Sequence, residues 1–185
     1  MKRYVLDSLK WMIFLTLICG MLYPFFVTGL ASALFPDEAR GRLIRSKDGN
    51  VVGSGLMGQK FTSERYFHGR PSSVDYVTVP SGASHLSPTS TSLMETIRER
   101  SKSDVDSASV PAELLMASGS GLDPHLTEEG ALFQTKRIAL ARGVPEVKIR
   151  ELVDRQVFGQ NPFLPSERLV NVLLLNLSLD ESFNP

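Results

Sequence analysis

The chain has 185 residues, and its 20 basic and 20 acidic side chains give a formal net charge of zero at pH 7. Because neither sign dominates and no basic stripe runs along the sequence, nucleic acid is excluded as an expected partner. The only cysteine lies in an apolar run and the three histidines lie far apart, so the sequence predicts no disulfide, no thiol chemistry and no metal site.

The most informative segment is the apolar run at residues 11–35, which contains no charged side chain. As a helix rising about 1.5 Å per residue it would cover roughly 37 Å, more than the roughly 30 Å hydrocarbon core of a bilayer. A cleaved signal peptide is the alternative, but its apolar part is usually only about 7–15 residues long. We therefore expect a short tail at residues 1–10 and a retained membrane helix at 11–35, with a kink at Pro24.

The charges beside this run do not settle its orientation. Three bases precede the run and four follow it before residue 50, so the positive-inside count is nearly even. Long domains are translocated largely regardless of flanking charge, and the tail before the run is very short. We expect a single-pass protein of the cell (inner) membrane, with a cytoplasmic N-terminus and an extracytoplasmic domain.

The sequence after the run predicts an α+β (mixed α/β) globular domain anchored by one N-terminal transmembrane helix. An exit linker is expected at residues 36–49 and the domain at 50–185. Val51 and Val52 precede a glycine-rich stretch and predict a short strand. The apolar residues 169–179 predict a buried strand.

Helices are predicted between these two strands. Thr127 is expected to cap the clearest of them, and Gly143 to end it. Ala131, Ile138 and Ala139 are its expected inward-facing residues. The predicted helices cover residues 90–103, 111–117, 127–142 and 145–157.

The sequence GSGLMG at residues 53–58 matches the glycine pattern of dinucleotide-binding folds. That function requires a helix that begins at the third glycine, and none is predicted after Gly58. We therefore interpret these residues as a glycine-rich turn.

A second small-residue segment consists of Ser118, Gly119, Ser120 and Gly121. Such a loop can hold a phosphate through backbone amides, although the lysine of a P-loop is missing. Ser120 and His125 also leave open a membrane-anchored extracytoplasmic hydrolase, because geometry rather than chain order defines a catalytic triad. The structural alternative is a tight loop with positive φ at its glycines, tied down by Asp123.

Several long segments in the same order resemble one family, the C subunit of the Kdp-type potassium-transporting ATPase of bacteria and archaea. The resemblance covers nearly the whole chain and rests on long stretches rather than on a short pattern. They are Tyr23-Pro24 with Val27-Thr28-Gly29-Leu30, GQKFTSERYFHGRPS at residues 58–72, VPAELLMASGSGLDPH at 110–125 and VNVLLLNLSLD at 170–180.

The resemblance implies a non-catalytic accessory subunit of an ATP-driven potassium uptake complex. Its partners would be a P-type ATPase subunit, a channel-like potassium subunit and a small single-helix subunit. Potassium is then the transported ion of the complex, and no cofactor is bound firmly by this chain. The family is described as a catalytic chaperone that raises the ATP affinity of the ATPase subunit, which implies a transient nucleotide contact at Gln134, near residues 118–121.

An extracytoplasmic domain could not meet ATP, so the resemblance leaves a second function open. In that version the domain caps the external mouth of the potassium subunit and braces the assembly. The chain also departs from the family near His85, Ser87 and Ser90, where Asn or Gly is more usual. Since His and Ser adopt positive φ less readily, we expect a reshaped loop there.

Overall fold

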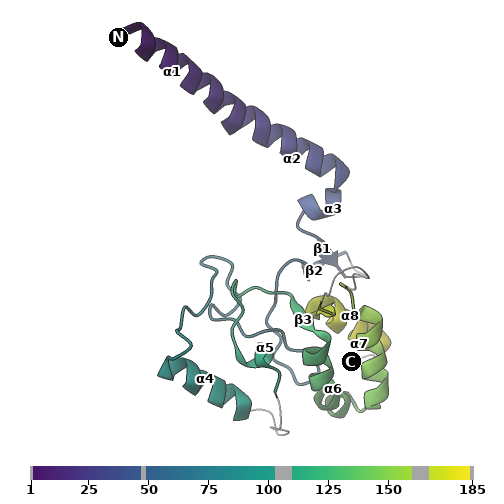
Figure 1. Cartoon of the computed structure of the whole chain (residues 1–185). Coiled ribbons are helices and arrows are strands. Elements are labelled where there is room, and N and C mark those ends of the chain that lie inside the picture. Colours follow the sequence, from purple (N-terminus) through teal and green to yellow (C-terminus); the bar gives the residue numbers. More distant parts are fainter. Residues whose placement is uncertain (1, 47–48, 103–109, 160–166, 184–185) are drawn as a thin grey trace. The chain divides into compact units, whose positions relative to one another are not determined.

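The structure is a computed structural model that describes residues 2–46, 49–102, 110–159 and 167–183. Its contacts divide the chain into two compact units, Met1–Leu43 and Ile44–Pro185 (Figure 1). Helices and strands are both present, and one N-terminal apolar helix is long enough to span a membrane. The predicted fold class is therefore confirmed.

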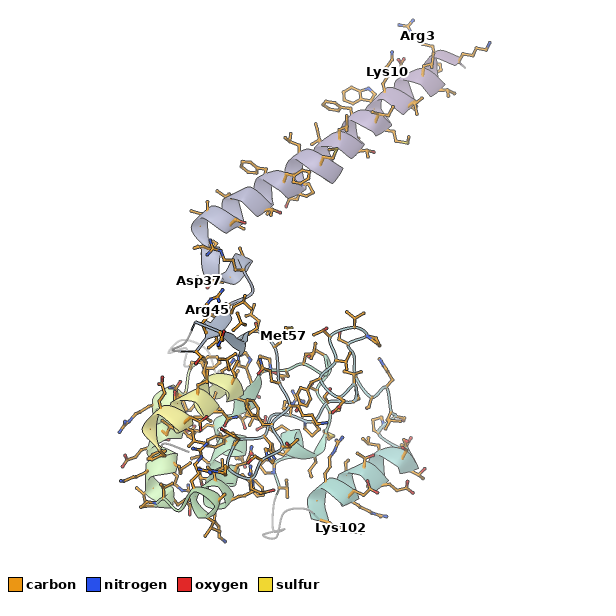
Figure 2. The ribbon with its side chains drawn as sticks, turned by 180° about the vertical axis from the view of Figure 1, so that it is seen from behind. Arg3, Lys10, Asp37, Arg45, Met57 and Lys102 are labelled. Atoms are coloured by element: carbon orange, nitrogen blue, oxygen red, sulfur yellow. The ribbon has the colours of Figure 1, made fainter. Side chains whose placement is uncertain are left out.

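The first unit is dominated by a continuous helical stretch, Lys2–Leu34, whose side chains project outward along its whole length (Figure 2). It consists of α1 (Lys2–Leu17), a π-helical turn (Ile18–Leu22) and α2 (Tyr23–Leu34). The helix therefore begins within the expected tail. The expected exit linker contains the short helix α3 (Pro36–Ala39) and strand β1 (Leu43–Arg45).

The π-helical turn lies directly before Pro24, where the sequence predicts a kink. The Tyr23 amide donates to the carbonyl of Ile18, five residues back, as π-helical geometry requires. Pro24 has no amide hydrogen, so one bond of the regular helical ladder is lost in any case. The wider turn accommodates this loss while both neighbouring segments stay helical.

The second unit contains the remaining helices and two small sheets, apart from Leu43, the first residue of β1. β1 pairs with β2 (Val51–Ser54), and β3 (His125–Thr127) pairs antiparallel with β4 (Leu169–Asn171), with His125 opposite Asn171. The helices are α4 (Thr91–Lys102), α5 (Ala112–Leu115), α6 (Glu128–Arg142), α7 (Glu146–Gln156) and α8 (Val172–Ser182).

The core forms where α6, α7 and α8 pack around the β3–β4 pair. Ile138, Ile149, Leu175 and Leu179 are fully buried there. α6 is stabilised at its ends as the sequence predicts, since the Thr127 side chain accepts from the Gly130 amide and residue 143 adopts a left-handed φ of 68°. Ala131, Ile138 and Ala139 of α6 are buried, which confirms its predicted inward face.

The predicted strand at residues 169–179 is wrong beyond its first three residues. After Asn171 the chain turns into α8, and the Asn171 side chain caps this helix by accepting from the Leu174 amide at 3.2 Å. Residues 172, 175, 176 and 179 share the buried face at helical spacing. A short, almost wholly apolar run gives no periodic signal, so its sequence pattern could not separate a buried strand from a buried helix.

The chain departs from the family pattern at residues 85, 87 and 90, and one of these three adopts a left-handed backbone conformation. His85 adopts a φ of 54°, whereas Ser87 and Ser90 do not take positive φ. Of these three residues, His85 is therefore the one whose backbone adopts a conformation that Asn or Gly adopts more readily.

Gly58 provides a stability test, because a Cβ atom there would lie 2.6 Å from the backbone oxygen of Asp123. We expect Gly58→Ala to destabilise the full chain by about 1–3 kcal/mol through overpacking, lowering Tm by several degrees. Gly119→Ala is the matched control, because a Cβ at Gly119 meets nothing within 4 Å. Thermal unfolding by circular dichroism in detergent measures both variants, and equal Tm values would contradict the close packing at Gly58.

Candidate functional site

The candidate site is built around residues 64–70, an irregular segment whose backbone pairs with side chains rather than with a strand. Asn176 of α8 contacts both backbone groups of Phe67. Its amide oxygen accepts from the Phe67 N–H at 2.8 Å and its amide nitrogen donates to the Phe67 carbonyl at 3.0 Å. Phe67 is fully buried, so these two bonds satisfy polar groups that water cannot reach.

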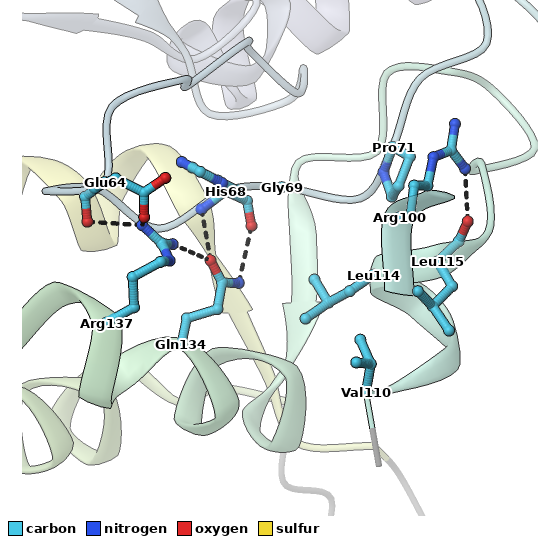
Figure 3. Close-up of a pocket in the computed structure, with 10 residues that line it drawn as sticks. All are labelled: Glu64, His68, Gly69, Pro71, Arg100, Val110, Leu114, Leu115, Gln134 and Arg137. Carbon is cyan, nitrogen blue, oxygen red and sulfur yellow. Dashed lines mark hydrogen bonds and ion pairs between the residues drawn. The ribbon is translucent and has the colours of Figure 1, made fainter. Parts of the chain in front are cut away.

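Gln134 of α6 makes the equivalent contact with the next residue (Figure 3). Its amide oxygen accepts from the His68 N–H at 2.8 Å, and its amide nitrogen donates to the His68 carbonyl at 3.0 Å. The second hydrogen of that nitrogen goes to the Gly130 carbonyl, and the oxygen also accepts from Arg137 at 2.9 Å. Two donors and two acceptor sites are all that a glutamine side chain has, and here all four are used.

Arg137 holds the beginning of the same segment from the next turn of α6. Its guanidinium donates to the carbonyl of Glu64 at 2.6 Å and to the carbonyl of Tyr66 at 3.0 Å. It also lies 3.4 Å from the Glu64 carboxylate. Together with Asn176 and Gln134 it forms a set of side chains that we call the backbone clamp.

A partly buried ion pair, between Arg142 of α6 and Asp180 of α8, links the two helices that carry the clamp. The Arg142 side chain is only 1% exposed, and it contacts Asp180 at 2.6 Å and the carbonyl of Arg65 at 2.8 Å. The Tyr66 hydroxyl donates to the same carboxylate at 2.9 Å, and its ring lies under the guanidinium. Burial, followed by this hydrogen bond to Asp180, raises the pKa of Tyr66 above its ordinary value.

A cavity of about 330 Å³ lies beside the clamp, between residues 64–71 and helices α4, α5 and α6. Gln134, Arg137 and Glu64 form its polar wall, and Pro71 and Leu114 lie on the apolar wall (Figure 3). This volume is at the lower end of the roughly 300–1,000 Å³ usual for small-molecule sites.

Arg100 is a further cation of this cavity. It donates to the Leu115 carbonyl at 2.6 Å, and burial lowers its pKa. Arg100 and Arg137 thus both donate to the protein's own carbonyl groups. The cavity can therefore accept a small group, but its polar wall is already used to hold the chain's own backbone.

The structure does not bring residues 118–121 into this cavity, although Gln134 lines it. Ser118 is buried and its amide donates to the Pro71 carbonyl. Gly121 has a φ of 70°, as expected, and a Cβ there would lie 2.8 Å from the Gly82 carbonyl. Gly119 does not take a positive φ, so the expectation holds for one of the two glycines.

Two amides at the end of this loop are hydrogen-bonded within it. The Gly121 amide donates to Ser118, and the Leu122 amide donates to the Ser120 hydroxyl at 3.1 Å. These contacts favour the structural loop over a phosphate cradle, because an amide that is bonded within the protein is not available to an anion.

The geometry does not support a pair of reacting groups at Ser120 and His125. The His125 ring lies edge-on to Phe158, and its Nδ1 atom is 3.9 Å from Asp123. Within the described ranges, no hydrogen bond joins Ser120 to His125, and no group of three or more His, Cys, Asp or Glu side chains is placed to hold a metal ion.

Asn176, Arg142 and Asp180 are site residues that sequence reasoning missed. The available signal was weak: Asn176 is a polar residue inside an apolar run, VNVLLLNLSLD. In a buried segment such a residue requires a hydrogen-bond partner. The sequence could show that a partner was needed, but it could not show that Phe67 provides it.

Comparison with known proteins gives the family. The family model described as "K+-transporting ATPase, c chain" matches residues 5–181, which include nearly all of the apolar helix and the whole clamp. The chain belongs to this family. The resemblance that the sequence segments indicate is therefore confirmed.

Individual members of the family match over nearly their full length. The chain is 44% identical to the potassium-transporting ATPase KdpC subunit of Rhodopseudomonas palustris (strain BisB5), over 97% of this chain and 98% of that one. It is 45% identical to that of Methylobacterium nodulans, over 98% of both chains. It is 46% identical to that of Gloeobacter violaceus, over 88% of this chain and 87% of that one.

The clamp predicts a large effect from a small change at Gln134. Gln134→Glu keeps the shape but replaces the donating nitrogen with an oxygen that faces the carbonyls of His68 and Gly130. We expect a loss of about 2–4 kcal/mol, because buried acceptors lose their donor and a charge is buried. Thermal unfolding measures this loss against Leu140→Ala, an exposed position on the same helix. A Tm equal to that of the control would show that the clamp does not stabilise the fold.

A second prediction concerns the ion pair between the buried Arg142 and the partly exposed Asp180. Asp180→Asn leaves the Arg142 charge buried without its carboxylate, so we expect a loss of about 2–4 kcal/mol. Glu151→Gln is the control, because its pair with Arg155 is exposed and such pairs contribute about 0–1 kcal/mol. Denaturant unfolding of both variants gives the comparison. Equal midpoints would show that burial does not strengthen the Arg142 contact.

Proposed function

We propose that this chain is a non-catalytic accessory subunit of an ATP-driven potassium uptake complex. In this proposal it is needed for assembly and for potassium-coupled ATP hydrolysis by a P-type ATPase subunit. The observation that carries the proposal is the backbone clamp, whose polar side chains hold the chain's own backbone instead of facing a substrate. The kind of complex, a potassium-transporting ATPase, comes from the names of the family and of its relatives.

The proposed location is the cell (inner) membrane, with the helix crossing it once and the N-terminus in the cytoplasm. The helix carries Gly20 and Gly29, although a Cβ at Gly29 would meet nothing within 4 Å and one at Gly20 would make only an ordinary contact with Thr16, at 3.9 Å. Glycine in a helix costs about 1 kcal/mol relative to alanine, so the chain itself gains nothing from these residues. Small residues allow the close approach of a neighbouring helix in lipid, which supports packing against a membrane-embedded partner subunit.

Of the two versions of the function, the structure favours the brace over the nucleotide contact. Gln134, the residue implied in ATP binding, would have to break bonds to His68, Gly130 or Arg137 to contact a ligand. The cavity beside it is at the small end for ligands, and residues 118–121 do not line it. A rigid domain that caps the external mouth of the channel-like potassium subunit requires neither an ATP site nor a cytoplasmic location.

The test is to purify the complex with and without this chain from cells that express the other subunits. We expect that without it the ATPase and channel-like subunits no longer co-purify stoichiometrically, and that potassium-stimulated ATP hydrolysis is lost. A stable complex that hydrolyses ATP and transports potassium normally without the chain would contradict the proposal.

Ser120→Ala separates the two versions and also tests the hydrolase alternative. Because Ser120 is exposed and its hydroxyl serves the local turn by accepting from the Leu122 amide, the brace version predicts an unchanged KM for ATP in the complex. A clear rise in that KM would favour the nucleotide contact. Labelling of the wild-type chain by a serine-reactive probe, abolished in this variant, would favour the hydrolase.

A further inference from the structure

The apolar helix of the first unit contains one irregular turn. Between Ile18 and Leu22 the helix is π-helical, and the Tyr23 amide donates to the Ile18 carbonyl, five residues back. In a regular α-helix the same amide would donate to Cys19, four residues back. The hydrogen bonds of this turn are therefore shifted by one residue relative to those of the α-helices before and after it.

Within the described helix, Lys2–Leu34, this shift leaves the Cys19 carbonyl without an amide donor. The amide four residues further on belongs to Tyr23, and it is bonded to Ile18. The residue five further on is Pro24, which has no amide hydrogen. Neither the regular nor the wider helical bond can form at this carbonyl, so its acceptor is left unused.

A second polar group lies one turn further along the helix. Tyr23 is at the middle of the uncharged run at residues 11–35, and it is 64% exposed. Its hydroxyl makes no hydrogen bond to the described residues. Side chains of a helix lean toward its N-terminus, so the Tyr23 side chain leans over the turn that contains Cys19. An unused acceptor and an unused hydroxyl thus lie one turn apart in an apolar segment.

The helix is narrow beside these two groups. Gly20 follows Cys19 and has no side chain, and a Cβ there would make only an ordinary contact with Thr16, at 3.9 Å. The Thr16 hydroxyl donates to the Met12 carbonyl at 2.7 Å, so it is not the donor that the Cys19 carbonyl requires. Small residues one turn apart allow a neighbouring helix to approach closely in lipid.

An unpaired carbonyl is strongly unfavourable at this depth. Cys19 lies eight residues into the apolar run, about 12 Å from its beginning at a helical rise of about 1.5 Å per residue. Water is scarce in the hydrocarbon core, so backbone groups there must be bonded to protein. A proline in a membrane helix is tolerated where a neighbouring helix, a hydroxyl side chain or an ordered water replaces the lost bond.

We propose that the Cys19 carbonyl and the Tyr23 hydroxyl form a hydrogen-bonding site inside the membrane for one side chain of the channel-like potassium subunit. A carboxamide or hydroxyl side chain fits it, because such a group can donate to the carbonyl and accept from the Tyr23 hydroxyl. A charged side chain does not fit, since the run carries no opposite charge. The inference rests on the proposed function, whose brace version makes the channel-like subunit the one that this chain holds.

The first test observes the carbonyl itself. Cys19 is the only cysteine, so cysteine carrying ¹³C in its carbonyl group labels this single backbone position. The infrared band of a labelled carbonyl is separated from the others, and it moves to lower frequency when the oxygen accepts a hydrogen bond. The labelled full chain is measured alone in lipid nanodiscs and again after assembly with unlabelled partner subunits.

We expect the Cys19 band at the frequency of an unbonded carbonyl in the chain alone and at a lower frequency in the complex. The control is Cys19→Ser with Ala31→Cys, because the carbonyl of residue 31 accepts from the Phe35 amide at 2.8 Å and should give the same low frequency in both. An unchanged Cys19 band would overturn the proposal. A band that is already low in the chain alone would also overturn it, because water or a second copy would then be the donor.

The second test uses Pro24→Ala, which supplies the missing amide. Alanine favours a helix and proline disrupts it, so this variant is expected to form the helix at least as well as the wild type. If a partner uses the site, the variant competes poorly, and its ratio to co-expressed wild-type chain in the purified complex falls about threefold to tenfold. Tyr23→Phe should behave similarly, whereas Tyr4→Phe, which removes a hydroxyl outside the apolar run, should not. Equal incorporation of Pro24→Ala and the wild type would contradict the site.

A third measurement identifies the partner. A photoreactive benzophenone side chain at residue 23 should cross-link the chain to the channel-like potassium subunit in the complex. Cross-linking to the ATPase subunit or to a second copy instead would overturn the assignment. Failure of the unmodified chain to co-purify with any partner would contradict the proposed function itself, whereas a complex that assembles without a shift of the Cys19 band would contradict this site alone.

Discussion

The second unit depends on one kind of interaction, the pairing of helical amide side chains with the backbone of residues 64–70. An irregular segment in a protein core leaves N–H and C=O groups that cost about 1–3 kcal/mol each when unpaired. Here Asn176 and Gln134 each pair with both backbone groups of a single residue. The segment can therefore pass between α6 and α8 without a neighbouring strand.

This arrangement bears on function because the hydrogen-bonding groups of these side chains are already bonded within the chain. A catalytic or ligand-binding amide needs a free donor or acceptor, and Gln134 has none left. Arg137 and Arg142 likewise donate to backbone carbonyl groups of the same segment. A domain that uses its buried polar groups in this way is suited to being a rigid body, which is what a brace in a membrane complex requires.

The core also holds the turn that follows β2. Asn171 caps α8 and donates to the Gly55 carbonyl, so one side chain joins the C-terminal helix to this turn.

The sequence by itself determined the features that depend on local composition and spacing: an uncharged run long enough to span a membrane, the capped helix from residue 128, and the family. Tertiary structure decided the rest. The apolar sequence of α8 shows no periodicity that separates a helix from a strand. It forms a helix because its buried face packs in the core and Asn171 caps its first turn. Gln134 belongs to the clamp because the fold brings it to His68. The two residues lie 66 positions apart in sequence, and no local pattern encodes so distant a pairing.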